Sequence, residues 1–96
     1  MFEVKQTEAF AEWLGGLRDQ EARGRIAARL RRAQAGNLGD VKPVGGSVFE
    51  MRVDHGPGYR LYFAQQGKVV VVLLCGGDKR TQARDIAKAK QMVKEI

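Results

Sequence analysis

The pattern of hydrophobic and polar residues divides the chain into short segments with different periods. Apolar residues run without a break from Val69 to Cys75, which is typical of a strand buried on both faces in the middle of a sheet. Gly76 and Gly77 are expected to end this strand. In the other segments the apolar residues either alternate with polar ones or recur with a helical period. We therefore expect each of these segments to bury one apolar side around the central strand.

The N-terminal part is predicted to form a strand and two helices. Residues 2–6 alternate between apolar and polar, as in a strand with one buried face. From Glu8 the spacing becomes that of an amphipathic helix, which Thr7 can cap. Its apolar stripe consists of Phe10, Trp13, Leu14 and Leu17. A second helix is expected over residues 20–35, with Asp19 as its cap.

Two alternating segments, residues 48–53 and 59–65, are expected to pair as a β-hairpin. Burying both apolar sets requires a turn with an odd number of residues, which His55-Gly56-Pro57 and Gly56-Pro57-Gly58 both provide. Either turn sends the side chains of Arg52, Arg60 and Tyr62 to one side of the sheet, away from the helices.

The remaining segments complete the expected fold. Residues 36–46 contain glycines and Pro43 and are expected to form a loop. Residues 82–96 have a helical period and predict a last helix, which Thr81 or Asp78 would cap. The chain is therefore expected to be one α+β domain over residues 1–96. Its two layers would be a four-stranded, largely antiparallel sheet and helices on one face of that sheet.

Composition then narrows the classes of function. The 96 residues include 17 Lys and Arg against 11 Asp and Glu, and the net charge of +6 predicts a polyanionic partner or an acidic protein. The single cysteine, Cys75, argues against a disulfide scaffold or a metal cluster and favours a reducing cytoplasm. No apolar run resembles a signal peptide or could span a bilayer, so we expect a soluble cytoplasmic protein.

The residues needed for metal or serine chemistry are not present in the required patterns. One histidine and one cysteine give no metal-ligand spacing, and the only serine, Ser47, is not in a nucleophile elbow. No metal and no cofactor is therefore expected. A group of cations remains on the hairpin and after the central strand: Arg52, Arg60, Lys79 and Arg80. Because guanidinium groups bind phosphate oxygens bidentately, the three arginines could hold one phosphodiester.

Such a group would suit the cleavage of RNA. The 2′-hydroxyl of RNA is itself the nucleophile, so the protein has to align it, move protons and neutralise the charge of the phosphorane. Asp85 and His55 are the candidate proton acceptors. Each also has a simpler interpretation, because Asp85 suits the dipole of a helix N-terminus and His55 can be a solvated turn residue.

Several other residues have two interpretations. Candidate RNA contacts are Lys42, His55, Tyr62 and Gln82. Lys42 can equally be a solvated lysine, and Trp13 can stack on a base or, as its place on the helical stripe favours, lie in the core. The arginines of the second helix form either a solvated face or a surface for phosphates or an acidic partner.

Four segments carry a resemblance to a known superfamily: FEMR at 49–52, GPGYRLYF at 56–63, VVLLCGGDK at 71–79 and TQARDI at 81–86. Through them nearly the whole chain resembles the RelE/ParE toxins, and among these the HigB-type, phage Gp49-like group. The resemblance implies a RelE-like fold and a toxin of a type II toxin–antitoxin pair that cleaves mRNA, usually on the ribosome. Its partner would be a helix-turn-helix, HigA-like antitoxin, and the toxin would be monomeric or part of a hetero-oligomer.

The resemblance also implies roles for individual residues. Arg52, Arg60 and Arg80 would contact the scissile phosphate, and Lys79 would assist. The chain has Ile86 where some relatives carry a proton-transferring tyrosine or histidine, so the base is left open. Glu50 stands where the best-known mRNA interferases have a basic residue.

Two alternatives to a nuclease remain within the superfamily. A ParE-like protein would inhibit DNA gyrase by binding alone, and a degenerate member would only bind its antitoxin. The pair Arg52 and Arg60, together with Lys79 and Arg80, favours the nuclease, because a gyrase binder needs no group of cations of the size of a phosphate.

Overall fold

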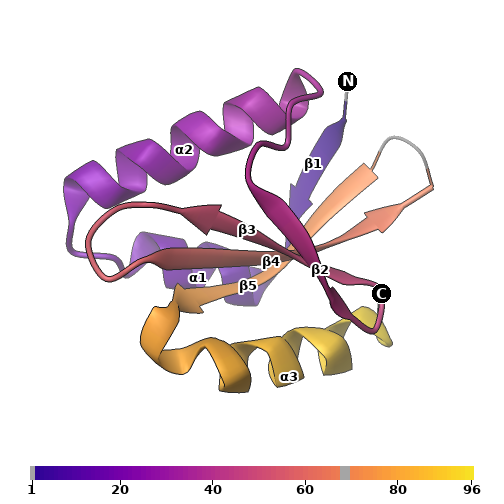
Figure 1. Cartoon of the computed structure of the whole chain (residues 1–96). Coiled ribbons are helices and arrows are strands. Elements are labelled where there is room, and N and C mark those ends of the chain that lie inside the picture. Colours follow the sequence, from indigo (N-terminus) through magenta and orange to yellow (C-terminus); the bar gives the residue numbers. More distant parts are fainter. Residues whose placement is uncertain (1, 68–69) are drawn as a thin grey trace.

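The computed structural model describes residues 2–67 and 70–96, which form a five-stranded sheet and three helices (Figure 1). The elements in chain order are β1 (Glu3–Gln6), α1 (Glu8–Gly15), α2 (Gln20–Gln34), β2 (Val41–Gly45), β3 (Val48–Val53), β4 (Tyr59–Gln66), β5 (Val70–Asp78), the 3-10 turn η1 (Lys79–Thr81) and α3 (Gln82–Val93). The strand order is β1-β5-β4-β3-β2, with β1 parallel to β5 and all other neighbours antiparallel. The predicted α+β class is confirmed.

The strand β5 lies between β1 and β4 and is buried on both faces, as its unbroken apolar sequence predicts. All residues from Val71 to Cys75 are buried. Val69, the predicted first residue of the strand, lies outside the described residues. Burial raises the pKa of the Cys75 thiol to about 11, so this cysteine is an unreactive core residue, as expected.

The strand does not end at Gly76 and Gly77 but continues to Asp78. The prediction took both glycines as strand terminators, whereas each makes room for a side chain. The ring of Trp13 lies against Gly76 on one face, and the carboxylate of Asp85 lies against Gly77 on the other. A Cβ atom on either glycine would overlap these groups.

The sheet has a separate core on each face. On the first face, Phe10 of α1 and Ile26 of α2 belong to a buried cluster with Leu61 of β4. On the second face, Ala89 of α3 belongs to a cluster with Tyr62 of β4. Figure 1 shows α2 and α3 on opposite sides of the sheet. The expectation of all helices on one face therefore differs from the structure, because the two-sided apolar strands need a cover on both faces.

The segment 36–46, which was expected to be a loop, contains the edge strand β2. This strand pairs antiparallel with β3, and its register shifts between Pro43 and Gly45. A proline donates no ladder hydrogen bond and is confined to edge strands, which is where β2 lies. Its glycines and proline concealed the strand in the sequence, so the sheet has five strands and not four.

The β3–β4 hairpin follows the predicted register. Val53 pairs with Tyr59, which leaves five residues, an odd number, in the turn. Arg52 pairs with Arg60, so these two side chains share one face as expected. The expectation that this face lies away from the helices is wrong for Tyr62, which is fully buried beneath α3.

The helix caps and the place of Trp13 also follow the sequence prediction. The Thr7 hydroxyl accepts a hydrogen bond from the amide of Phe10, and the Asp19 carboxylate accepts one from the amide of Ala22. Trp13 packs against the core on the first face of the sheet, and the centroid of its ring lies 5.6 Å from that of the Phe10 ring. The last helix ends at Val93, earlier than the predicted Ile96. Among the described residues, no helix has the length and apolarity needed to cross a membrane.

The close contact of Trp13 with β5 predicts opposite effects for two glycine substitutions. Gly76→Ala should lower the free energy of unfolding by about 1–3 kcal/mol, because the added methyl group overpacks against the indole ring. Gly24→Ala is the matched control in α2, where no atom beyond the adjacent residues and the nearby backbone of the helix lies within 4 Å of the new Cβ, and it should raise the free energy of unfolding by about 0.5–1 kcal/mol. Urea unfolding measures both values. Equal changes in the two variants would contradict this packing.

Candidate functional site

The hairpin register brings two arginines together on the second face of the sheet. Arg52 on β3 and Arg60 on β4 are direct cross-strand partners. Like charges in this position destabilise a sheet unless anions lie nearby. The structure provides an anion for each: Asp40 lies 3.4 Å from Nη2 of Arg52, and Glu50 lies 3.8 Å from Nε of Arg60.

A hollow of about 390 Å³ opens at the turn end of this hairpin. Its lining residues are Asp40, Arg52, Asp54, Gly56, Pro57, Gly58, Arg60 and Lys79. We call it the arginine hollow. The structure thus brings together three of the predicted site residues, Arg52, Arg60 and Lys79, from β3, β4 and η1. Sequence reasoning missed the carboxylates of Asp40 and Asp54, which face the same hollow.

Arg52 has a partner that it can exchange. The side chains of Arg52 and Asp40 are 41% and 61% exposed. An ion pair with this exposure contributes about 0–1 kcal/mol, because water and salt screen it. An incoming phosphate therefore competes easily with Asp40 for this guanidinium group.

Arg60 is held more firmly. Its side chain is 13% exposed, and that of its partner Glu50 is fully buried. At 3.8 Å, in surroundings with an effective dielectric constant near 20, the attraction is about 4 kcal/mol before the cost of desolvation. Nη1 of Arg60 also donates to the backbone carbonyl of Tyr59. The guanidinium group is therefore fixed at two points.

Glu50 is the centre of a buried polar cluster. Its Oε2 accepts hydrogen bonds from the Tyr62 hydroxyl at 3.0 Å and from Nε2 of Gln82 at 2.7 Å. Its Oε1 lies 4.0 Å from Nζ of Lys42. We call Glu50, Arg60, Lys42, Tyr62 and Gln82 the Glu50 cluster. The pairing of Glu50 with Tyr62 in the predicted register was the sequence signal for this contact.

Three of the predicted RNA contacts, Tyr62, Gln82 and Lys42, belong to the Glu50 cluster. Tyr62 is fully buried, so the predicted contact with RNA is not compatible with its position. Desolvation, and next its hydrogen bond to Glu50, raise the pKa of Tyr62, which therefore keeps its proton. The amide of Gln82 is engaged by Glu50, and Lys42, about half exposed, lies at the rim of the cluster.

Arg80 lies apart from the other two predicted arginines. Its side chain is 81% exposed, and its Nη2 donates a hydrogen bond to Oδ2 of Asp78 at 3.0 Å. This hydrogen bond raises the pKa of Arg80. It lines a second hollow of about 340 Å³ that includes Trp13 and Asp85. Pro57 lines both hollows, so they are neighbours. The three predicted arginines therefore line two neighbouring hollows, and Arg80 is not among the residues that line the arginine hollow.

The two candidate proton acceptors lie outside the arginine hollow. Asp85 lies in the first turn of α3 and is 5% exposed. Its Oδ2 accepts a hydrogen bond from the hydroxyl of Thr81. Nε2 of His55 lies 3.0 Å from Oδ2 of Asp19, the cap of α2. The amide of Ala22, and next His55, lower the pKa of the Asp19 carboxyl. Both candidates thus have structural partners of their own.

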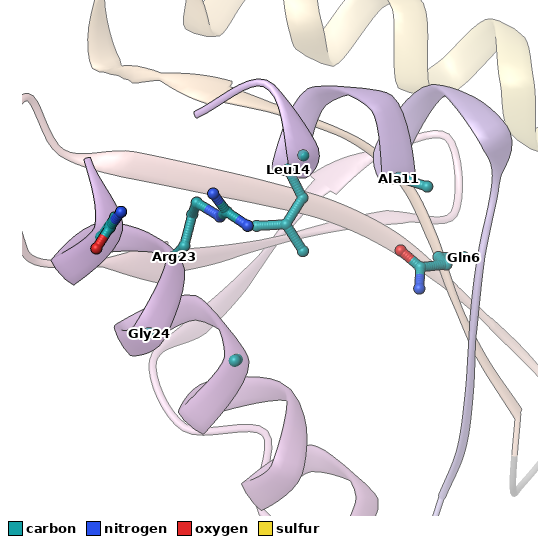
Figure 2. Close-up of a pocket in the computed structure, with 8 residues that line it drawn as sticks. Gln6, Ala11, Leu14, Arg23 and Gly24 are labelled. Carbon is teal, nitrogen blue, oxygen red and sulfur yellow. The ribbon is translucent and has the colours of Figure 1, made fainter. Parts of the chain in front are cut away.

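Another hollow, of about 660 Å³, lies between α1 and α2 (Figure 2). Its lining residues are Gln6, Ala11, Leu14, Gly15, Gln20, Arg23, Gly24 and Ala27. It contains none of the predicted site residues and carries one charge, that of Arg23. Within residues 2–67 and 70–96, no group of His, Cys, Asp or Glu side chains has the arrangement of a metal site.

Comparison with known proteins identifies the family. Residues 12–94 match the family described as phage-derived protein Gp49-like (DUF891). An "Uncharacterized protein" of Haemophilus influenzae (strain ATCC 51907 / DSM 11121 / KW20 / Rd) is 47% identical over 94 residues, which cover 98% of this chain and 95% of that protein. The chain therefore belongs to the phage-derived Gp49-like family, which is associated with the toxins of toxin–antitoxin systems and so implies an antitoxin as partner.

Proposed function

We propose that this toxin is an endoribonuclease that cleaves mRNA and that a helix-turn-helix antitoxin neutralises it. The arginine hollow carries the proposal. Arg52, Arg60 and Lys79 come from three elements and line one concave site. Nε of Arg52 is buried and donates no hydrogen bond within the described residues. Buried donors without a partner are rare in proteins, and a phosphate oxygen would satisfy this one.

The chemistry needs only groups that RNA and this hollow supply. The 2′-oxygen attacks the adjacent phosphorus, and the bond from phosphorus to the 5′-oxygen breaks. A 2′,3′-cyclic phosphate and a 5′-hydroxyl result. Arg52 and Arg60 would stabilise the extra negative charge of the phosphorane, which is the largest contribution a protein makes to such a reaction. Lys79 would bind the same or the neighbouring phosphate.

Proton transfer would use the carboxylates of the arginine hollow. Asp54 is exposed and makes no hydrogen bond or ion pair with the described residues, and Asp40 becomes available when a phosphate replaces it at Arg52. Each can accept the proton of the 2′-hydroxyl within this hollow, and a water molecule at the open hollow would supply the proton that the departing 5′-oxygen takes up. Asp85 and His55 would then stabilise the fold and take no part in proton transfer. Arg80 would bind a flanking nucleotide in the neighbouring hollow.

The remaining positive charge suits a ribosome-bound message as the substrate. The exposed arginines of α2 are Arg23, Arg25, Arg31 and Arg32. Together with the net charge of +6 they provide attraction to nucleic acid that does not depend on sequence. Binding should therefore weaken steeply as the salt concentration rises.

Removing one arginine of the hollow should abolish most of the cleavage. We expect Arg52→Ala to lower the rate on a translated message by about 100-fold or more, since one lost donor to a transition-state oxyanion has this effect. Lys5→Ala also removes one positive charge, from β1 at the far edge of the sheet, where its partner is the exposed Glu3, and should leave the rate nearly unchanged. The measurement is primer extension on the message in purified ribosomes.

Two outcomes would count against the nuclease. An equal loss of cleavage rate in Arg52→Ala and in its control variant would mean that only the net charge of the protein determines the rate. Intact message combined with loss of supercoiling by DNA gyrase would favour the ParE-like alternative. Arg80→Ala should weaken binding several-fold and leave the cleavage rate of bound RNA unchanged, because Arg80 lines the neighbouring hollow.

The proposed attack by the 2′-oxygen gives a second prediction. An RNA with a single 2′-deoxynucleotide at the cleavage position should stay intact, while the matched all-ribose RNA is cut to a cyclic phosphate end. End-group analysis by mass spectrometry checks the products. A 3′-hydroxyl end, or cleavage of the deoxy substrate, would exclude this mechanism.

A further inference from the structure

We propose that Glu50 is a positioning residue, which fixes the guanidinium group of Arg60 for the reaction while weakening the binding of RNA. The inference rests on the proposed function. Glu50 is fully buried in β3, and its four partners come from three other elements: Lys42 of β2, Arg60 and Tyr62 of β4, and Gln82 of α3. It touches neither the arginine hollow nor the solvent.

Packing alone does not explain a carboxylate in this position. A buried ion pair is often no more stabilising than apolar side chains of similar size, because both charges must lose their water. Oε1 of Glu50 accepts no hydrogen bond within the described residues, although Nε of Arg60 and Nζ of Lys42 lie near it. The cluster therefore keeps an unsatisfied acceptor beside an unsatisfied donor. This arrangement costs stability and calls for a functional reason.

The contacts of Glu50 supply that reason. Its Oε2 is held by Tyr62 and Gln82, so Oε1 has a fixed place beside Nε of Arg60. Arg60 in turn lines the arginine hollow. Gln82 is the first residue of α3 and directly follows η1, which begins with Lys79. Glu50 thus links the positions of two cations of the hollow.

The charge of Glu50 acts in the opposite direction on substrate binding. A buried carboxylate close to Arg60 reduces the positive potential that attracts a phosphate. A residue that improves orientation at the expense of attraction raises turnover and not affinity. A residue that merely holds the fold together would lower both when it is changed.

Glu50→Gln should therefore separate binding from cleavage. The amide oxygen still accepts from Tyr62 and Gln82, but the negative charge is lost. We expect about fivefold tighter binding of an RNA with a 2′-deoxynucleotide at the cleavage position in 0.1 M salt, the effect of one added phosphate contact. The single-turnover cleavage rate of bound all-ribose RNA should fall at least tenfold. Glu3→Gln makes the same charge change on β1 at the far edge of the sheet, and it should alter neither quantity.

Tyr62→Phe provides a second test that retains the charge. Tyr62 is fully buried, so its hydroxyl reaches the RNA only through Glu50. The cleavage rate should fall several-fold with unchanged affinity. Circular dichroism and thermal unfolding verify that each variant is folded. A folded Glu50→Gln protein with unchanged cleavage, or rate losses that match the unfolded fraction in both variants, would overturn the positioning role.

A spectroscopic measurement separates this inference from the proposed function. In the wild-type protein the Nε–H signal of Arg60 should exchange slowly with water, unlike that of the exposed Arg25, and it should exchange fast in Glu50→Gln. This result would hold even for a protein that cuts no RNA, in which case only the proposed function would fail. Equal exchange of Arg60 and Arg25 in the wild-type protein would overturn the positioning by Glu50.

Discussion

The burial of β5 on both faces is the constraint on which the rest of the structure depends. A strand with two apolar faces needs a cover on each, so α1 and α2 take one face and α3 takes the other. The chain must then turn sharply at the end of β5 to bring α3 back across the sheet. That turn is η1, and it places Lys79 at the mouth of the hairpin that carries Arg52 and Arg60. The site is a consequence of how the core is closed.

The two arginines of the hollow differ in a way that suits their proposed use. Arg52 is paired with an exposed aspartate and can change partners, whereas Arg60 is anchored by a buried glutamate and a backbone carbonyl. One movable cation beside one fixed cation allows a phosphate to be captured and then oriented. Two equally exposed arginines would attract RNA but would have to be ordered again in every turnover.

Sequence reasoning succeeded where a contact depends on local period and failed where it depends on distant elements. The hairpin register, and with it the pairing of Arg52 with Arg60, follows from alternation and turn length. The edge strand β2 was missed, because its proline and glycines resemble a loop until β3 is present to pair with it. Glycines that make room for Trp13 and Asp85 look the same in a sequence as glycines that end a strand.

The separation of Lys79 from Arg80 illustrates the same limit at the site itself. Adjacent residues in a 3-10 turn point about 120° apart, since the turn has three residues per revolution. Lys79 therefore faces the arginine hollow, and Arg80 faces the neighbouring one. A run of cations in a sequence gives the total charge of a region but not the number of charges that meet one phosphate. The sheet register determines that number, and here it pairs Arg52 with Arg60 and places Glu50 beside Arg60.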